Sequence, residues 1–244
     1  MSKLGHGQGK TLCRVVAFCS YLLVIGCLLL ACGGGSTKNT STQDIINHVA
    51  ARLDAVKSAH FAATIDGVAY IDTSRTIQLR SADGDIVPPD KMSAKIKIAI
   101  GPANVDVSLV TIGQDRYQTN PLTGAWGPVQ PGFDYSPAIL FDKDKGLSSV
   151  IKQMQNVERL GDDKVDGQAA YHLRGKVARA ALEPLSSGAI EGDPVAVELW
   201  VAQDSSNLLK VVLTEPQTPN KPKPAVWTLT FTKYDQPVTI ERPQ

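Results

Sequence analysis

Cysteine is the residue type with the clearest chemistry in this sequence. Cys32 follows Leu29, Leu30 and Ala31 and precedes three glycines. An aliphatic residue three positions before a cysteine, with a small residue directly before it, is typical of a lipobox. There the thiol accepts a diacylglyceryl group, and a peptidase cleaves before the cysteine. The spacing therefore predicts that Cys32 is lipidated and becomes the mature N-terminus.

The residues before Cys32 have the layout of a signal peptide. The chain begins with Lys3, Lys10 and Arg14 and no acidic residue, and residues 15–31 are almost wholly apolar. A basic start followed by an apolar run is typical of export signals. Residues 15–31 would form a helix of about 25 Å, which is short for a permanent membrane span. An uncleaved anchor helix is the alternative, and both interpretations place the rest of the chain outside the membrane.

Cleavage before Cys32 leaves few groups for catalysis. It removes Cys13, Cys19 and Cys27, so no free thiol remains for a disulfide, a metal or a nucleophile. The mature chain also has no Gly-x-Ser-x-Gly elbow and no Gly-rich phosphate loop after a strand. No two of its histidines have the spacing of metal ligands; these are His48, His60 and His172. We therefore expect no enzyme, metal or cofactor, and a hydrolase assembled from loops is the remote alternative.

Charge and composition suggest one exported domain. Removal of residues 1–31 takes away three of the 25 basic residues and none of the 24 acidic ones, which leaves a net charge of −2. This balance does not favour nucleic acid as a partner. We expect a lipoprotein signal peptide at 1–31, a lipidated cysteine and flexible Gly/Ser/Thr-rich tether at 32–42, and one domain at 43–244.

The elements of that domain follow from the period of the apolar residues. Helical spacing predicts helices at about 43–57, 142–156 and 178–187, the last broken near Pro184. Period-two alternation predicts strands, with turns between two pairs of them; the strands are 96–100, 105–109, 195–201, 209–213 and 227–231. Each strand is apolar on one face and polar on the other. This indicates an antiparallel sheet with one dry side and one wet side.

The alternation also identifies which residues face the dry side. We expect the inward set to include Ile96, Ile98, Val107, Leu109, Val197, Leu199, Val211 and Leu229. A sheet of about eight to ten strands usually curls. With only two or three helices to cover it, the dry side either fills with its own side chains or keeps a cavity. Periodicity leaves both possibilities open.

Four short motifs are spread over most of the mature chain. They are Tyr-x-x-x-Pro-x-Thr-Gly-x-Trp at 117–126, Gly-x-x-x-Tyr-x-Leu-x-Gly at 167–175, Val-x-Leu-Trp-Val at 197–201 and Tyr-x-x-Pro-Val-x-Ile at 234–240. Their order and spacing, together with the lipobox and first helix, resemble the LppX/LprA/LprF/LprG family of envelope lipoproteins. The loops at 83–90 and 216–224 match nothing in that pattern.

The resemblance implies an α+β fold with a single strongly bent antiparallel sheet. This half-barrel, similar to the LolA/LolB carriers, would have helices on its concave side around an apolar cavity. The family binds acyl chains of lipids or glycolipids and carries them across the cell envelope, so the eight inward residues would line the cavity. The implied partners are lipid or glycolipid cargo, the cell membrane through the anchor on its extracytoplasmic face, and an unknown envelope transporter. A structural or adhesin-like lipoprotein with a filled core is the alternative.

Overall fold

The computed structural model describes residues 40–129, 137–219, 221 and 223–244. All of the elements given below belong to one unit, Thr40–Gln244. The predicted signal peptide, Cys32 and most of the predicted tether lie outside the described residues. None of the helices in the described part of the chain is long and apolar enough to cross a membrane.

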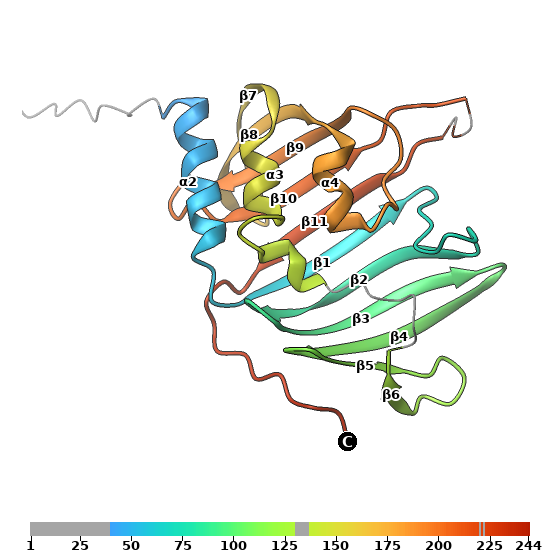
Figure 1. Cartoon of the computed structure of the whole chain (residues 1–244). Coiled ribbons are helices and arrows are strands. Elements are labelled where there is room, and N and C mark those ends of the chain that lie inside the picture. The colour runs from blue at the N-terminus through green and yellow to red at the C-terminus, as the bar shows by residue number, and fades with distance from the viewer. Residues whose placement is uncertain (1–39, 130–136, 220, 222) are drawn as a thin grey trace, which may run out of the picture. The chain divides into compact units, whose positions relative to one another are not determined.

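The described residues form one open antiparallel sheet of eleven strands, which curves around a few helices (Figure 1). The strands are β1 (Ala59–Asp66), β2 (Ile77–Val87), β3 (Lys91–Ile100), β4 (Ala103–Ile112), β5 (Asp115–Thr119), β6 (Trp126–Pro128), β7 (Gln155–Val165), β8 (Gln168–Val177), β9 (Val195–Ala202), β10 (Leu208–Thr214) and β11 (Val226–Thr232). The predicted α+β class with a single bent antiparallel sheet is confirmed.

Two meanders make up this sheet, in the order β6-β5-β4-β3-β2-β1-β11-β10-β9-β8-β7. They join where the first strand pairs with the last, from His60 opposite Thr232 to Asp66 opposite Val226. The first and last strands therefore pair at the centre of the sheet. Strands β6 and β7, from the middle of the sequence, form its two edges.

The helices lie on one face of the sheet (Figure 1). They are α2 (Thr42–Asp54), the 3₁₀ turn η1 (Pro137–Phe141), α3 (Leu147–Lys152) and α4 (Arg179–Ser186). Helix α2 is capped by Ser41, whose hydroxyl oxygen accepts a hydrogen bond from the Asp44 backbone N–H at 3.1 Å. This cap satisfies one of the free donors of the first turn.

The predicted helix bounds need correction. Helix α2 ends at Asp54 and not at 57, and α3 covers only Leu147–Lys152 of the predicted 142–156. The second helix is short because Gln155 already pairs with Lys176 as the start of β7, and Asn156 has a positive φ of 53°. Helix α4 continues to Ser186, two residues beyond Pro184, so the proline does not break it where expected.

The expected loop at 83–90 is mostly strand, since β2 extends to Val87. The inner positions of this segment are Ala82, Gly84 and Ile86, and the outer ones include Asp83 and Asp85. Alanine and glycine give a weak hydrophobic alternation, so the period-two pattern was not visible in the sequence.

The helices and the inner face of the sheet share one apolar core. Helix α2 contributes Ile45, Ile46 and Val49, which are almost fully buried. At the centre of the sheet, the rings of Phe141 and Phe231 meet edge to face, with centroids 5.8 Å apart. The face that the helices cover is therefore the dry side that alternation predicts.

Candidate binding site on the inner face

The structure buries the predicted inward residues in a single cluster. Seven of the eight are at most 7 % exposed, and Leu229 is half-buried and packs against the others. The cluster includes Ile96, Ile98, Val107, Leu109, Val197, Leu199 and Val211. Their common face is what the alternation predicts, while contact with a lipid stays a prediction.

Five of these eight residues belong to a continuous apolar row that crosses eight strands. From β8 to β4, the directly paired residues are Leu173, Leu199, Val211, Leu229, Ala63, Ala82, Ile96 and Val107. Neighbouring strands lie about 4.8 Å apart. The row is therefore long enough to lie along an extended hydrocarbon chain.

Side chains at the middle of this row are short. Ala63 of β1 and Ala82 of β2 separate the bulky residues of β8–β11 from those of β3 and β4. The neighbouring row has the same feature, because Ala94 pairs with Gly84 next to Phe61. A side chain at Gly84 would collide with β3, since an added Cβ would lie 2.2 Å from the Ser93 carbonyl oxygen. The short inner residues of β1 and β2 therefore alternate with the buried, larger Phe61 and Ile86.

The described helices cover this face mainly on its other half. Figure 1 shows α2, α3 and α4 in front of β7–β11, while η1 contacts β2 and β3. Helix α4 buries Leu182 and Leu185, and α3 buries Val150 and Ile151. The half of the sheet that contains β2 and β3 is therefore contacted by η1, while α2–α4 face the other half.

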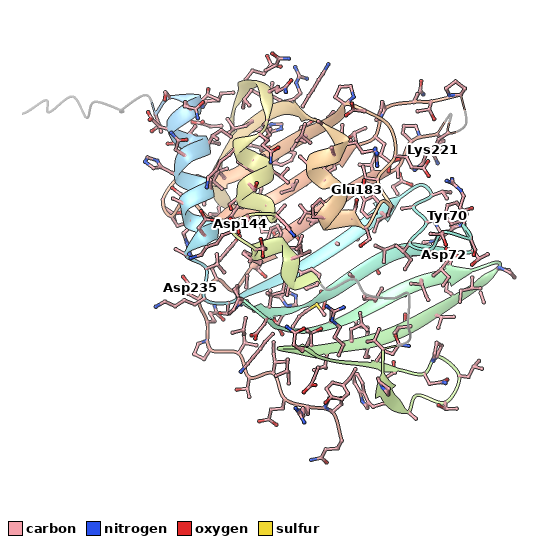
Figure 2. All side chains as sticks on the ribbon, viewed as in Figure 1. Tyr70, Asp72, Asp144, Glu183, Lys221 and Asp235 are labelled. Atoms are coloured by element: carbon pink, nitrogen blue, oxygen red, sulfur yellow. The ribbon has the colours of Figure 1, made fainter. Side chains whose placement is uncertain are left out.

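A buried ion pair lies at one end of the inner face. The fully buried Glu215 carboxylate is 2.5 Å from Lys221 Nζ, and it accepts hydrogen bonds from Trp227 Nε1 and the backbone N–H groups of Glu191 and Ala225. Figure 2 shows Lys221 on the same side of the molecule as Tyr70 and Asp72. This pair ties the loop between β10 and β11 to the end of the sheet.

A second polar cluster closes the opposite end, near Asp235 in Figure 2. Arg52 of α2 lies 2.6 Å from the Asp235 carboxylate, and the Tyr234 hydroxyl donates to the Leu208 carbonyl oxygen. Burial opposes ionisation of Asp235, but the hydrogen bond from the Lys57 backbone N–H and the charge of Arg52 lower its pKa below the usual value. Burial also raises the pKa of Tyr234. Both clusters are consistent with structural roles.

On the outer face, His60 and His172 each lie within hydrogen-bond distance of a carboxylate. His172 Nε2 is 2.7 Å from Glu198, and its ring stacks on Trp200 at 4.2 Å between centroids. His60 Nδ1 is 2.8 Å from Asp85. No group of three or more His, Cys, Asp or Glu side chains in the described residues is placed to hold a metal ion. The carboxylate partners lie on neighbouring strands. The sequence alone does not identify them, because the pairing depends on strand register.

Two surface clefts among the described residues lie elsewhere, and none of the eight predicted residues lines either one. The larger, about 520 Å³, is lined by Gln114, Asp115, Arg116, Tyr117, Pro128 and Val129. The smaller, about 300 Å³, lies between α3 and α4, where Figure 2 labels Asp144 and Glu183. The polar walls of the larger cleft do not suit an acyl chain. The inner face therefore remains the candidate site.

The amino-acid sequence is similar to a known family of lipoproteins. Residues 41–240 match the LppX_LprAFG lipoprotein family. The lipoarabinomannan carrier protein LprG of Mycobacterium tuberculosis strain H37Rv is 22 % identical over 238 residues, which cover 95 % of this chain and 96 % of LprG. The putative diacylated glycolipid transporter LprF of Mycobacterium bovis is 23 % identical over 217 residues, covering 82 % and 77 % of the two chains.

Solved structures share the same fold. The crystal structure of LprF from Mycobacterium bovis has a TM-score of 0.66 at 23 % identity and covers 82 % of this chain and 96 % of its own. The crystal structure of the Mycobacterium tuberculosis lipoprotein LppX has a TM-score of 0.56 at 18 % identity, covering 82 % and 100 %. At these identities the likeness concerns the fold alone.

Proposed function

The chain belongs to the LppX/LprAFG lipoprotein family, and from this premise we propose that it is a lipid carrier of the cell envelope. Its inner face would bind the acyl chains of lipids or glycolipids, and the protein would move them between membranes. A lipidated Cys32 would hold it on the extracytoplasmic face of the cell membrane. An envelope transporter would supply or receive the cargo.

The observation that carries this proposal is the apolar row with short side chains at its centre. An acyl chain has no polar group to recognise, so its binding depends on apolar surface and room. Each buried methylene contributes about 0.8 kcal/mol, so an extended chain along this row would be held by burial alone. Ala63 and Ala82 are directly paired and are the smallest side chains of this row.

The names of the relatives support the same class of ligand. LprG is named a lipoarabinomannan carrier and LprF a putative diacylated glycolipid transporter. Both names describe movement of acylated glycolipids and not their chemical conversion. We therefore extend to this chain a carrier role without catalysis, with a cargo that has at least one acyl chain.

One observation favours the alternative, a structural or adhesin-like lipoprotein. Val197 and Leu199 are at most 1 % exposed, as expected of a core packed to native density. In this alternative, the short side chains are covered by their neighbours and no cargo enters. The two functions predict different results when a bulky group is placed at the middle of the row.

The test uses Ala63→Trp and the matched variant Thr64→Trp. Ala63 lies on the inner row, and its neighbour Thr64 is exposed on the outer face. Native mass spectrometry would measure lipid that co-purifies with each protein from a mycobacterial host. We expect Ala63→Trp to lose lipid and keep its melting temperature, because the ring replaces the acyl chain, while Thr64→Trp keeps both.

A filled core predicts the reverse for Ala63→Trp. Overpacking typically costs about 1–3 kcal/mol, so this variant would melt early. A parent protein without any bound lipid, combined with such a loss of stability, would exclude the carrier role.

A further inference from the structure

Exposed apolar side chains gather at one end of the molecule. Among the described residues, five large hydrophobic side chains are exposed, and four of them lie in or beside turns. Val68 is in the β1–β2 connection, Ile100 ends β3, Leu122 is in the β5–β6 loop and Trp126 begins β6. We call these four residues the apolar rim. The fifth, Leu160, lies within the edge strand β7.

The topology explains why the rim residues lie at the same end. In an antiparallel meander, alternate turns fall at alternate ends of the sheet. The β1–β2, β3–β4 and β5–β6 connections are therefore on one side, at the right of Figure 1. The opposite turns, which include 88–90, 113–114 and 203–207, carry no exposed large hydrophobic residue in the described structure. Among the described turns, exposed large hydrophobic residues thus occur at only one of the two ends of the sheet.

The β5–β6 loop holds Leu122 outward on a hydrogen-bonded backbone. The Asn120 side-chain oxygen accepts hydrogen bonds from the backbone N–H groups of Leu122 and Thr123, at 2.8 and 3.1 Å. The backbone of Asn120 also bonds to Gly124 and Ala125. Leu122 is 95 % exposed on this loop. Because much of the loop's backbone hydrogen bonding is internal, the tip can leave water at a low cost in unpaired polar groups.

Two of the three rim turns carry no charge, whereas the β1–β2 connection contains Asp72 and Arg75. Residues 98–105 and 117–129, which form two of its turns, contain no Asp, Glu, Lys or Arg. Charged residues make up 20 % of the whole sequence. A protruding segment without charge, tipped by leucine and flanked by tryptophan, has the composition that favours the membrane–water interface.

We propose that the apolar rim docks this protein on the surface of a lipid bilayer. Leu122 and Ile100 enter the boundary between headgroups and acyl chains, and Trp126 lies at headgroup level. A second copy of the chain or a protein partner fits less well. Four side chains on three separate turns do not provide the about 800 Å² per partner of a standard protein interface.

This proposal is independent of the proposed lipid carriage, because it concerns exposed turns and not the inner face. It is tested with residues 40–244, which contain the whole sheet and its core as one unit and carry no lipid anchor. The probe is a vesicle of phosphatidylcholine and phosphatidylglycerol in equal parts, and flotation measures the bound fraction.

The decisive variants are Leu122→Asp with Ile100→Asp, compared with Leu160→Asp. Leu160 is 44 % exposed and lies away from the rim, so it controls for loss of a surface leucine. We expect the double variant to bind vesicles at least about tenfold more weakly, since carboxylates are disfavoured at the interface. Leu160→Asp and the inner-face variant Ala63→Trp should bind like the parent. Equal binding by the double variant would overturn the proposal.

A second measurement does not depend on the folding of the double variant. Vesicles with brominated acyl chains should quench the fluorescence of the parent, and the Trp126→Phe variant should lose most of that quenching. Quenching that persists unchanged in Trp126→Phe would contradict insertion of the rim. A rim-dependent dimer in solution, detected by light scattering, would assign the rim to a second copy instead.

Discussion

The ammonium of Lys221 compensates the negative charge of the buried Glu215 carboxylate. Glu215 is fully buried and Lys221 is nearly so, and the loop between β10 and β11 carries the lysine to the carboxylate. Removing one partner of a buried ion pair leaves the other charge buried without an opposite charge. This costs about 3–5 kcal/mol, more than the net contribution of the intact pair.

Lys221→Met should therefore lower the free energy of unfolding by about 3–5 kcal/mol, measured by urea denaturation. The control is Lys223→Met, which removes the same charge from an exposed position of the same loop. Adding Glu215→Gln to Lys221→Met should restore part of the loss, because a neutral amide oxygen still accepts from Trp227. If Lys221→Met and Lys223→Met have equal stability, the pair does not hold the loop.

Among the elements, the contact between β2 and β3 depends most on a single glycine. An added Cβ at Gly84 would lie 2.2 Å from the Ser93 carbonyl oxygen and 2.7 Å from Ala94 Cα, both of them backbone atoms. Gly84→Ala should therefore push the two strands apart and cost about 1–3 kcal/mol in urea denaturation. Gly127→Ala is the matched control, because nothing lies within 4 Å of its added Cβ. Equal stability of the two variants would show that β3 can shift without cost.

The strength of the local pattern explains which elements were predictable. The stripe of Ile45, Ile46 and Val49 predicts α2, and alternation around Ile96 and Val107 predicts the β3–β4 hairpin. Strand β7 has no such pattern, because most of its residues are exposed at the edge of the sheet. Its first residues were therefore assigned to the preceding helix, and that prediction was wrong.

The candidate site was predictable only in part, for a related reason. Alternation identifies bulky inward residues, but it gives no sign that Ala63 and Ala82 share a row with them, because that depends on strand register. The pairing of Glu215 with Lys221 depends on the path of a loop. The exposure of Leu122 was likewise not predictable, since an apolar residue in a hairpin motif is expected to be buried.

For the whole molecule, Cys32 is expected to determine where the protein resides. Cys32→Ala should leave an uncleaved, unlipidated precursor, because the thiol is the only acceptor for the diacylglyceryl group in the predicted lipobox. Metabolic labelling with an alkyne fatty acid should mark the parent and not the variant. A labelled Cys32→Ala protein would contradict the predicted anchor. A signal peptide that remains uncleaved in the parent would instead favour the anchor helix.

The pairing of β1 with β11 determines the order in which the parts of the sheet can assemble. Residues 59–66 and 226–232 form the centre of the sheet, so its two meanders join only when the first and last strands pair. A chain synthesised from its N-terminus gains the joining strand β11 after all the other strands, and such long-range pairing is slow to form. A truncation that removes only the final strand would split the sheet at its middle. Strand β11 therefore controls when the two halves of the sheet become one.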